Sequence, residues 1–257
     1  MGDGISRRPR AGPVGLTGTA RALAGRALDL LWPPRCPGCD TPHGPAESGG
    51  FCPACAGALP RLDPPVCLRC GEPLVADAAG PCDRCRRTPP AFTIARAACR
   101  FAGPARAAIH ALKFDGVRSA AAPLAALLAA DFDRWPALRD GVDAVLPIPL
   151  HPVRRRGRGY DQAAMLATGL ATARALPTLS GVVARARATP PQVGLDRAAR
   201  LVNLTGAFTV RVPAAVAGRT LLLVDDVLTT GATADACARA LLEAGAREVR
   251  VYTVARD

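Results

Sequence analysis

The stretch LLLVDDVLTTGATADACARALLEAGA, residues 221–246, joins an apolar run to two adjacent carboxylates and then to a turn rich in threonine and glycine. The apolar run at 221–224 predicts a buried strand, and residues 233–244 predict a helix that Gly245 ends. Asp225 and Asp226 then follow the strand, at the edge where an open α/β sheet binds its ligands. Adjacent carboxylates can accept hydrogen bonds from vicinal hydroxyls, such as those of a ribose.

The turn after the two acids has the composition of a phosphate-binding loop. It consists of Thr229, Thr230, Gly231, Ala232 and Thr233. Backbone N–H groups at the start of a helix lack intrahelical partners and attract anions, and three hydroxyls lie beside them. An ordinary strand-to-helix turn with an Asp cap would require neither two acids nor three threonines. The stretch therefore predicts a ribose 5-phosphate site.

The rest of the C-terminal region alternates between strand and helix patterns. Strands are predicted at residues 92–101, 144–148, 221–224 and 249–254, and helices at 104–113, 120–133, 162–174 and 233–244. This alternation predicts a parallel α/β sheet flanked by helices.

Eight of the ten cysteines lie near the N-terminus in four CxxC pairs. The pairs are Cys36/Cys39, Cys52/Cys55, Cys67/Cys70 and Cys82/Cys85. Two such turns can surround one tetrahedral ion, so the pattern predicts two structural Zn²⁺ sites with no open catalytic position. Sequential and interleaved pairing of the turns both remain open. A redox or disulfide framework needs fewer CxxC turns and an oxidising compartment. We expect this module to need metal to fold, and metal removal to spare the C-terminal domain.

The organisation that follows is a disordered leader at 1–19, a short helix and double zinc ribbon at 20–90, and an α/β domain at 91–257. The helix is expected at 20–31, and a proline pair at 89–90 marks the linker. No stretch approaches the ~20 apolar residues of a membrane span. Together with the cysteine usage, this favours a cytoplasmic protein. The formal charge of +12 comes almost entirely from arginine and favours polyanionic ligands.

The motif VDDVLTTGAT resembles the phosphoribosyl pyrophosphate motif of type I phosphoribosyltransferases. With LPIPLHPVRRRGRGYDQA, ALKFDG, RARATPPQVGLDRAARLVNLTGAF and the cysteine turns, the chain resembles the competence protein F (ComF) family. The resemblance implies a type I phosphoribosyltransferase-like sheet after a zinc-ribbon module. It assigns the ribose hydroxyls to Asp225 and Asp226 and the 5-phosphate to the following loop. One departure is Asp161, where the family more often has asparagine, and Asp40 replaces a usual glycine.

The resemblance also assigns roles to charged segments outside the motif. Arg154, Arg155, Arg156 and Arg158 would form the loop that meets pyrophosphate, although a solvated basic loop or a nucleic-acid contact are alternatives. Gln192, Arg197 and Arg200 fall in the region of a mobile lid. The lone lysine, Lys113, is a candidate anion ligand.

Two classes of function are therefore expected. The first is a domain that binds phosphoribosyl pyrophosphate with Mg²⁺ bridging the diphosphate and transfers the phosphoribosyl group to an acceptor that the sequence does not identify. The second is a non-catalytic competence factor that binds single-stranded DNA through its zinc ribbons and arginines, beside a DNA-uptake helicase. An aromatic content of 4% offers few platforms for stacked bases.

Overall fold

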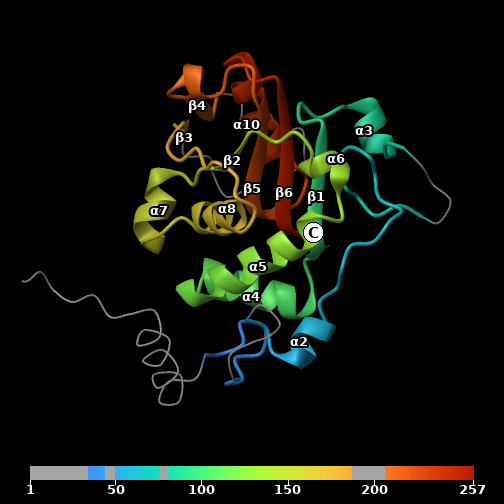
Figure 1. Cartoon of the computed structure of the whole chain (residues 1–257), viewed down its shortest axis with the longest axis vertical. Coiled ribbons are helices and arrows are strands. Elements are labelled where there is room, and N and C mark those ends of the chain that lie inside the picture. The colour runs from blue at the N-terminus through green and yellow to red at the C-terminus, as the bar shows by residue number, and fades with distance from the viewer. Residues whose placement is uncertain (1–33, 44–49, 76–79, 187–205) are drawn as a thin grey trace, which may run out of the picture.

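Four parallel strands form the central sheet, in the order β1-β6-β5-β2 (Figure 1). They are β1 (Ile94–Arg100), β6 (Glu248–Arg256), β5 (Thr220–Leu228) and β2 (Ala144–Pro147). The parallel α/β sheet predicted from the alternating pattern is confirmed.

The computed structural model describes residues 34–43, 50–75, 80–186 and 206–257. The expected leader, the helix at 20–31 and the lid candidates Gln192, Arg197 and Arg200 lie outside these ranges.

Helices cover both faces of the sheet because its strands are apolar on both faces. Leu222 and Val224 of β5 join one core with α4 (Gly103–Lys113), α5 (Ala121–Phe132) and α8 (Gln162–Ala173). Leu221 and Leu223 point to the other core, which holds α10 (Ala232–Glu243) and the hairpin β3 (Val183–Arg185)–β4 (Phe208–Val210). Alternate residues of one strand thus build two separate cores.

Strand β5 is longer than its apolar run predicted. Pairing with β6 continues to Leu228, opposite Arg256, so Asp225 and Asp226 lie within the strand and not after it. The prediction that the strand ends before the acids is wrong because backbone pairing does not stop where hydrophobicity does.

Several short elements were not predicted from the sequence. They are α2 (Pro53–Gly57), α3 (Asp83–Arg87), η1 (Arg118–Ala120), α6 (Pro136–Arg139), α7 (Pro152–Arg158), η2 (Pro213–Ala215) and the β3–β4 hairpin. Among the described residues, no helix has the length and hydrophobicity needed to cross a bilayer.

The cysteine-rich segment packs directly against the sheet. Between the two pairs of CxxC turns, the chain runs along the outer edge of β1. There Arg100 N donates to Pro60 O over 2.8 Å, and the backbone of Arg61 forms an isolated antiparallel β-bridge with Cys99. A strand edge left open offers unpaired N–H and C=O groups. The N-terminal module therefore covers one edge of the C-terminal sheet.

Candidate functional site

A pocket of about 420 Å³ opens at the carboxyl ends of β2 and β5. Its polar lining comes from six helices and strands and from two residues outside them. The residues are Lys113 and His110 of α4, Arg154 and Arg158 of α7, Gln162 of α8, Arg185 of β3, Asp225 and Asp226 of β5, Thr233 of α10, and also Thr229 and Asp257. Ligands of α/β sheets bind at this edge. The structure thus brings the two acids, two of the five turn residues and two of the four arginines around one cavity.

The two adjacent acids project to opposite sides of β5, as strand geometry requires. Asp226 is 3% exposed and contacts Lys113 and Gln162. Asp225 is partly exposed, and its Oδ1 accepts a 2.8 Å hydrogen bond from the Asp226 amide. Asp225 also lines a second hollow of about 40 Å³ at the start of α10, which Asp226 does not. Asp225 is therefore the acid that faces both cavities.

The charge state of Asp225 depends on its surroundings. Enclosure by protein and the nearby charge of Asp226 raise the pKa of Asp225 from 3.8 to about 8, although Lys113 opposes this shift. A ligand that supplies hydroxyl donors or positive charge would favour the ionised form.

The threonine turn forms the wall of the smaller hollow. Gly231 precedes α10 with φ +80°, a left-handed conformation that favours glycine, and no side chain caps the helix at this residue. The Thr230 hydroxyl accepts from Ala232 N over 3.4 Å. The hollow is lined by Thr229, Gly231, Ala232 and Thr233, so four of the five predicted loop residues surround it. A helix N-terminus with flanking hydroxyls can hold an anion.

The predicted arginine loop is a helix. Pro152 starts α7, the His151 side chain accepts from Val153 N, and Gly159 ends the helix in a left-handed conformation. The interpretation as a loop is wrong because proline at the first position and arginines, which form helices readily, outweigh Gly157.

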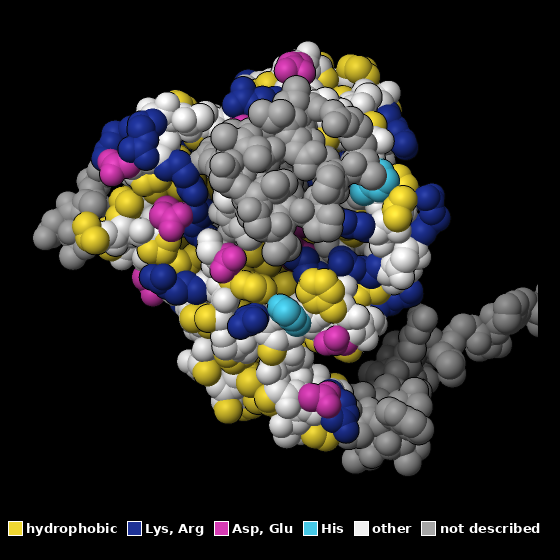
Figure 2. All heavy atoms as spheres, turned by 180° about the vertical axis from the view of Figure 1, so that it is seen from behind, with side chains coloured by type: hydrophobic (Ala, Val, Ile, Leu, Met, Phe, Trp, Pro, Cys, Tyr) yellow, Lys and Arg dark blue, Asp and Glu magenta, His cyan; other side chains and the backbone are white. Residues whose placement is uncertain are grey.

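The helical geometry separates the four arginines. Arg154 and Arg158, four residues apart, line the main pocket, whereas Arg155 lines a neighbouring hollow of about 440 Å³ and Arg156 lines neither. Arg154, Arg155 and Arg156 are exposed. Figure 2, which shows the side behind Figure 1, displays basic side chains gathered among hydrophobic ones.

Some lining residues were not predicted as site residues from the sequence. Gln162 and Arg185 are 4% and 9% exposed, and Phe114, at 68%, lies at the rim beside Lys113. A buried glutamine at a helix start gives no distinctive sequence signal, so its role emerges only from the fold.

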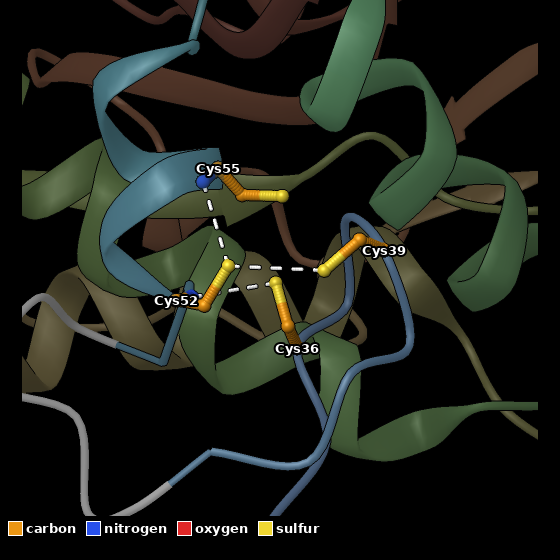
Figure 3. A group of neighbouring side chains, drawn as sticks. All are labelled: Cys36, Cys39, Cys52 and Cys55. Carbon is orange, nitrogen blue, oxygen red and sulfur yellow. Dashed lines mark hydrogen bonds between the residues drawn. The ribbon is translucent and has the colours of Figure 1, made fainter.

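Each set of four consecutive CxxC cysteines converges on one point. Cys36, Cys39, Cys52 and Cys55 form one group and Cys67, Cys70, Cys82 and Cys85 the other, with the sulfur atoms of each group within 4.8 Å of one another. Figure 3 shows the first group, in which Cys52 and Cys55 come from the start of α2. The sequential pairing is thus the one the structure adopts.

The sulfur geometry fits a tetrahedral zinc ion. Cys39 Sγ lies 3.7 Å from Cys52 Sγ, and Cys70 Sγ lies 3.8 Å from Cys82 Sγ. Four sulfurs at about 2.3 Å from a central Zn²⁺ would be about 3.8 Å apart. Both groups therefore have the ligand set and spacing of zinc ribbons.

Backbone amides prepare individual thiols for metal binding. Hydrogen bonds from Thr41 lower the pKa of Cys39 to about 6. Burial disfavours the Cys67 thiolate, but amides of Cys70 and Cys82 outweigh it and bring its pKa to about 6. Burial raises the pKa of Cys55. Without a cation, the thiols of one group cannot all be charged together.

The second cysteine group lies among arginines. Arg84 Nη2 donates to Cys70 Sγ over 3.1 Å, Arg256 Nη1 to Cys70 O over 2.9 Å, and Arg96 Nη1 to Cys67 O over 3.2 Å. Arg96 and Arg256 are only 5% and 4% exposed. Buried guanidinium groups need negative partners. Arg256 has the carboxylate of Glu72, and a tetrathiolate zinc centre would supply further negative charge beside both arginines.

Comparisons with known proteins agree with both parts of the chain. Residues 27–104 match the double zinc ribbon domain family, and residues 116–257 match the phosphoribosyl transferase domain family. The DNA utilization protein YhgH of Escherichia coli (strain K12) is 34% identical over 209 residues, which cover 80% of this chain and 90% of that protein. Competence protein F of Haemophilus influenzae is 30% identical over 211 residues, with the same coverage of each chain.

Among solved structures, glutamine phosphoribosylpyrophosphate amidotransferase from B. subtilis, complexed with ADP and GMP, matches 49% of this chain at 25% identity and a TM-score of 0.31. The match spans 26% of that chain. YhgH and competence protein F, in contrast, match most of this chain over nearly all of their own length. In this chain a double zinc ribbon precedes the phosphoribosyltransferase domain, in the order expected. The chain therefore belongs to the competence protein F family.

Proposed function

We propose that the pocket at the carboxyl ends of β2 and β5 binds phosphoribosyl pyrophosphate or a related ribose 5-phosphate. The observation that carries this proposal is the convergence of Asp225, the turn residues Thr229 and Thr233, and the arginine pair Arg154 and Arg158 on one cavity of about 420 Å³. The same acid and the same two threonines line the smaller hollow at the start of α10. The phosphoribosyl transferase family match of residues 116–257 supports the same assignment.

Each group has a defined task in this proposal. The first N–H groups of α10 and the threonine hydroxyls hold the 5-phosphate. Asp225 accepts the ribose hydroxyls, and Arg154 and Arg158 neutralise the diphosphate with guanidinium groups that can bind two oxygens each. Displacement of pyrophosphate at the anomeric carbon would need little more from the protein than this electrostatic stabilisation.

Mg²⁺ is proposed to enter the site on the diphosphate. In the described part of the chain, only the two cysteine groups bring several metal-binding side chains together, and both oxygens of Asp226 already accept hydrogen bonds. The residues thus fit an ion held mainly by the ligand's own oxygens, as is usual for Mg²⁺ with phosphates. When bound, it would neutralise charge on the leaving pyrophosphate.

Calorimetric titration with Mg²⁺ and phosphoribosyl pyrophosphate tests the assignment. We expect saturable binding that is weakened about tenfold or more by Asp225→Ala, because a charged hydrogen-bond acceptor is lost. Asp115→Ala, an exposed acid just after α4, is the matched control and should leave affinity unchanged. Single replacement of Asp225 is preferable to a double replacement, since loss of Asp226 would leave Lys113 without its counter-ion. Unchanged affinity in Asp225→Ala would refute the assignment.

A second candidate function is binding of single-stranded DNA. One relative is named a DNA utilization protein and the other competence protein F. Its support in this chain is the exposed arginine surface of α7, in particular Arg155 and Arg156, which do not line the ribose pocket. A DNA-uptake helicase remains the proposed neighbour in that setting.

Fluorescence anisotropy with a labelled oligonucleotide at several salt concentrations tests DNA binding. Arg155→Glu/Arg156→Glu should weaken binding at least about tenfold and flatten the dependence of affinity on salt, because two phosphate contacts are lost. Arg219→Glu, exposed at the opposite end of β5, is the charge control. An equal loss in the double variant and in this control would indicate a nonspecific effect of net charge.

A further inference from the structure

Lys113, the only lysine in the chain, forms an ion pair inside the ribose pocket. Its Nζ lies 2.7 Å from Oδ1 of Asp226, and the two side chains are 24% and 4% exposed. A buried carboxylate without a partner is strongly destabilising, so this contact compensates the charge of Asp226. The same contact reduces the capacity of Lys113 to receive a phosphate.

The other oxygen of Asp226 is also occupied. Gln162 Nε2 donates to Asp226 Oδ2 over 3.0 Å, and Gln162 Oε1 accepts from Arg158 Nη1. Because Arg158 can only donate, the amide carbonyl must face Arg158 and the amide NH₂ must face Asp226. The ends of α4, α7 and α8 are thereby tied to one carboxylate on β5.

These contacts give the two acids different roles: Asp226 is paired within the protein, and Asp225 is open to a ligand. Asp226 accepts from two donors and is almost fully enclosed. Asp225 is partly exposed at the pocket, and the donor to its Oδ1 among the described residues is the neighbouring amide of Asp226. Lys113 also opposes the rise in the pKa of Asp225. Loss of Lys113 would leave the charge of Asp226 uncompensated and raise the pKa of Asp225 further, so Asp225 would give up its proton to a ligand less readily.

We propose that Lys113 is a positioning residue of the ribose site: as the counter-ion of Asp226 it keeps Asp225 able to accept ligand hydroxyls, and it is not a receptor for the ligand's phosphates. This inference rests on the proposed function. It replaces the expectation, drawn from the sequence, that Lys113 binds an anion directly.

The test compares two ligands that share phosphates but differ in hydroxyls. Affinities of ribose 5-phosphate and of Mg²⁺-pyrophosphate are measured by calorimetry for the full chain with Lys113→Gln, Lys113→Arg and Arg219→Gln. The last variant loses the same charge at the far end of β5 and corrects for net charge. Relative to that control, Lys113→Gln should weaken ribose 5-phosphate about tenfold or more and pyrophosphate less than about threefold. Lys113→Arg should recover part of the loss.

Several results would overturn the inference. Equal weakening of both ligands would make Lys113 a phosphate receptor, and no weakening of ribose 5-phosphate would remove its positioning role. If the unaltered protein binds neither phosphoribosyl pyrophosphate nor ribose 5-phosphate, the proposed function fails and this inference fails with it.

A second measurement does not depend on ligand binding. The acylation rate of Lys113 by an amine-reactive ester, followed by peptide mass analysis, reports whether its ammonium group is held by Asp226. Asp226→Asn should raise that rate about fivefold or more, because a neutral amide holds the Lys113 side chain less tightly than a carboxylate does and leaves it more accessible to the reagent. The rate at the N-terminal amine serves as the internal reference. An unchanged rate at Lys113 would contradict the ion pair on which the proposal depends.

Discussion

Asp225 is the residue at which folding and ligand binding make opposite demands on charge. Its pKa is raised to about 8 by enclosure and by Asp226, so the folded protein holds this proton more tightly than the unfolded chain. The associated stabilisation is complete below the unfolded pKa of 3.8 and is lost progressively as pH rises to about 8. A neutral side chain at this position would not show that loss.

We therefore expect Asp225→Asn to be more stable than the unaltered protein, by a margin that grows by about 1 kcal/mol between pH 6 and pH 8. This difference in the free energy of unfolding is well below the one that a pKa shift of this size would give for a fully buried group, because the side chain is partly exposed and water screens its charge. Urea unfolding at both pH values measures it, with Asp115→Asn as the exposed control. A margin that shrinks as pH rises would contradict the raised pKa.

At the same scale, the sequence predicted the acids and the threonine turn but not their partners. The order of apolar run, acid pair and TTGAT is local, and a local pattern can be read without a fold. Lys113 and Gln162 reach Asp226 from 113 and 64 positions away, respectively. The sequence marks Lys113 only as a candidate anion ligand and does not mark Gln162, so only the packing of α4 and α8 identifies both as partners of Asp226.

At the scale of elements, the sequence predicted the presence of the sheet's strands better than their lengths. The apolar run at 221–224 revealed β5, yet the strand continues through both acids because β6 supplies pairing partners as far as Arg256. The family resemblance implies a loop after β2. The helix α7 forms there because Pro152 and His151 start it and Gly159 ends it. The residues that start and end this helix thus outweigh the unfavourable Gly157 inside it.

The cysteine module shows a different limit at this scale. CxxC spacing predicted the eight candidate ligands, because two thiols three residues apart on a tight turn can share an ion. Which turns pair depends on the path between them, and the structure brings consecutive turns together. How the module packs on the sheet could not be predicted, since Gly71 and β1 come into contact only in the fold. A Cβ on Gly71, whose φ is +68°, would lie 2.7 Å from Ala95 O.

Over the whole molecule, the cysteine groups belong to the cores of the C-terminal sheet. Cys36 and Cys55 pack in the core shared with α4 and α5, and Cys67, Cys70 and Cys85 pack in the core shared with α10. The intervening chain covers the edge of β1. This arrangement argues against the expectation that metal removal spares the C-terminal domain, because the same apolar surfaces serve both parts.

We expect the protein to carry two Zn²⁺ per chain and to lose stability as one unit when a chelator removes them. Unfolding of the ribbons would uncover β1 and remove the ribbon partners of Arg96 and Arg256, which are the carbonyl groups of the second cysteine group and the carboxylate of Glu72. The melting temperature of the sheet should fall by at least about 5 °C, because loss of a structural zinc removes several kcal/mol.

Metal analysis, calorimetric melting and hydrogen exchange at the amides of β6 measure these effects. Two variants separate the contributions of the centres: Cys39→Ser alters the exposed ligand of the first group, and Cys70→Ser alters the ligand that contacts Arg84 in the second. Cys70→Ser should destabilise β6 more, since only the second group contacts Arg256 of that strand. Two separate transitions, with exchange in β6 unchanged by the chelator, would restore the view of independent domains.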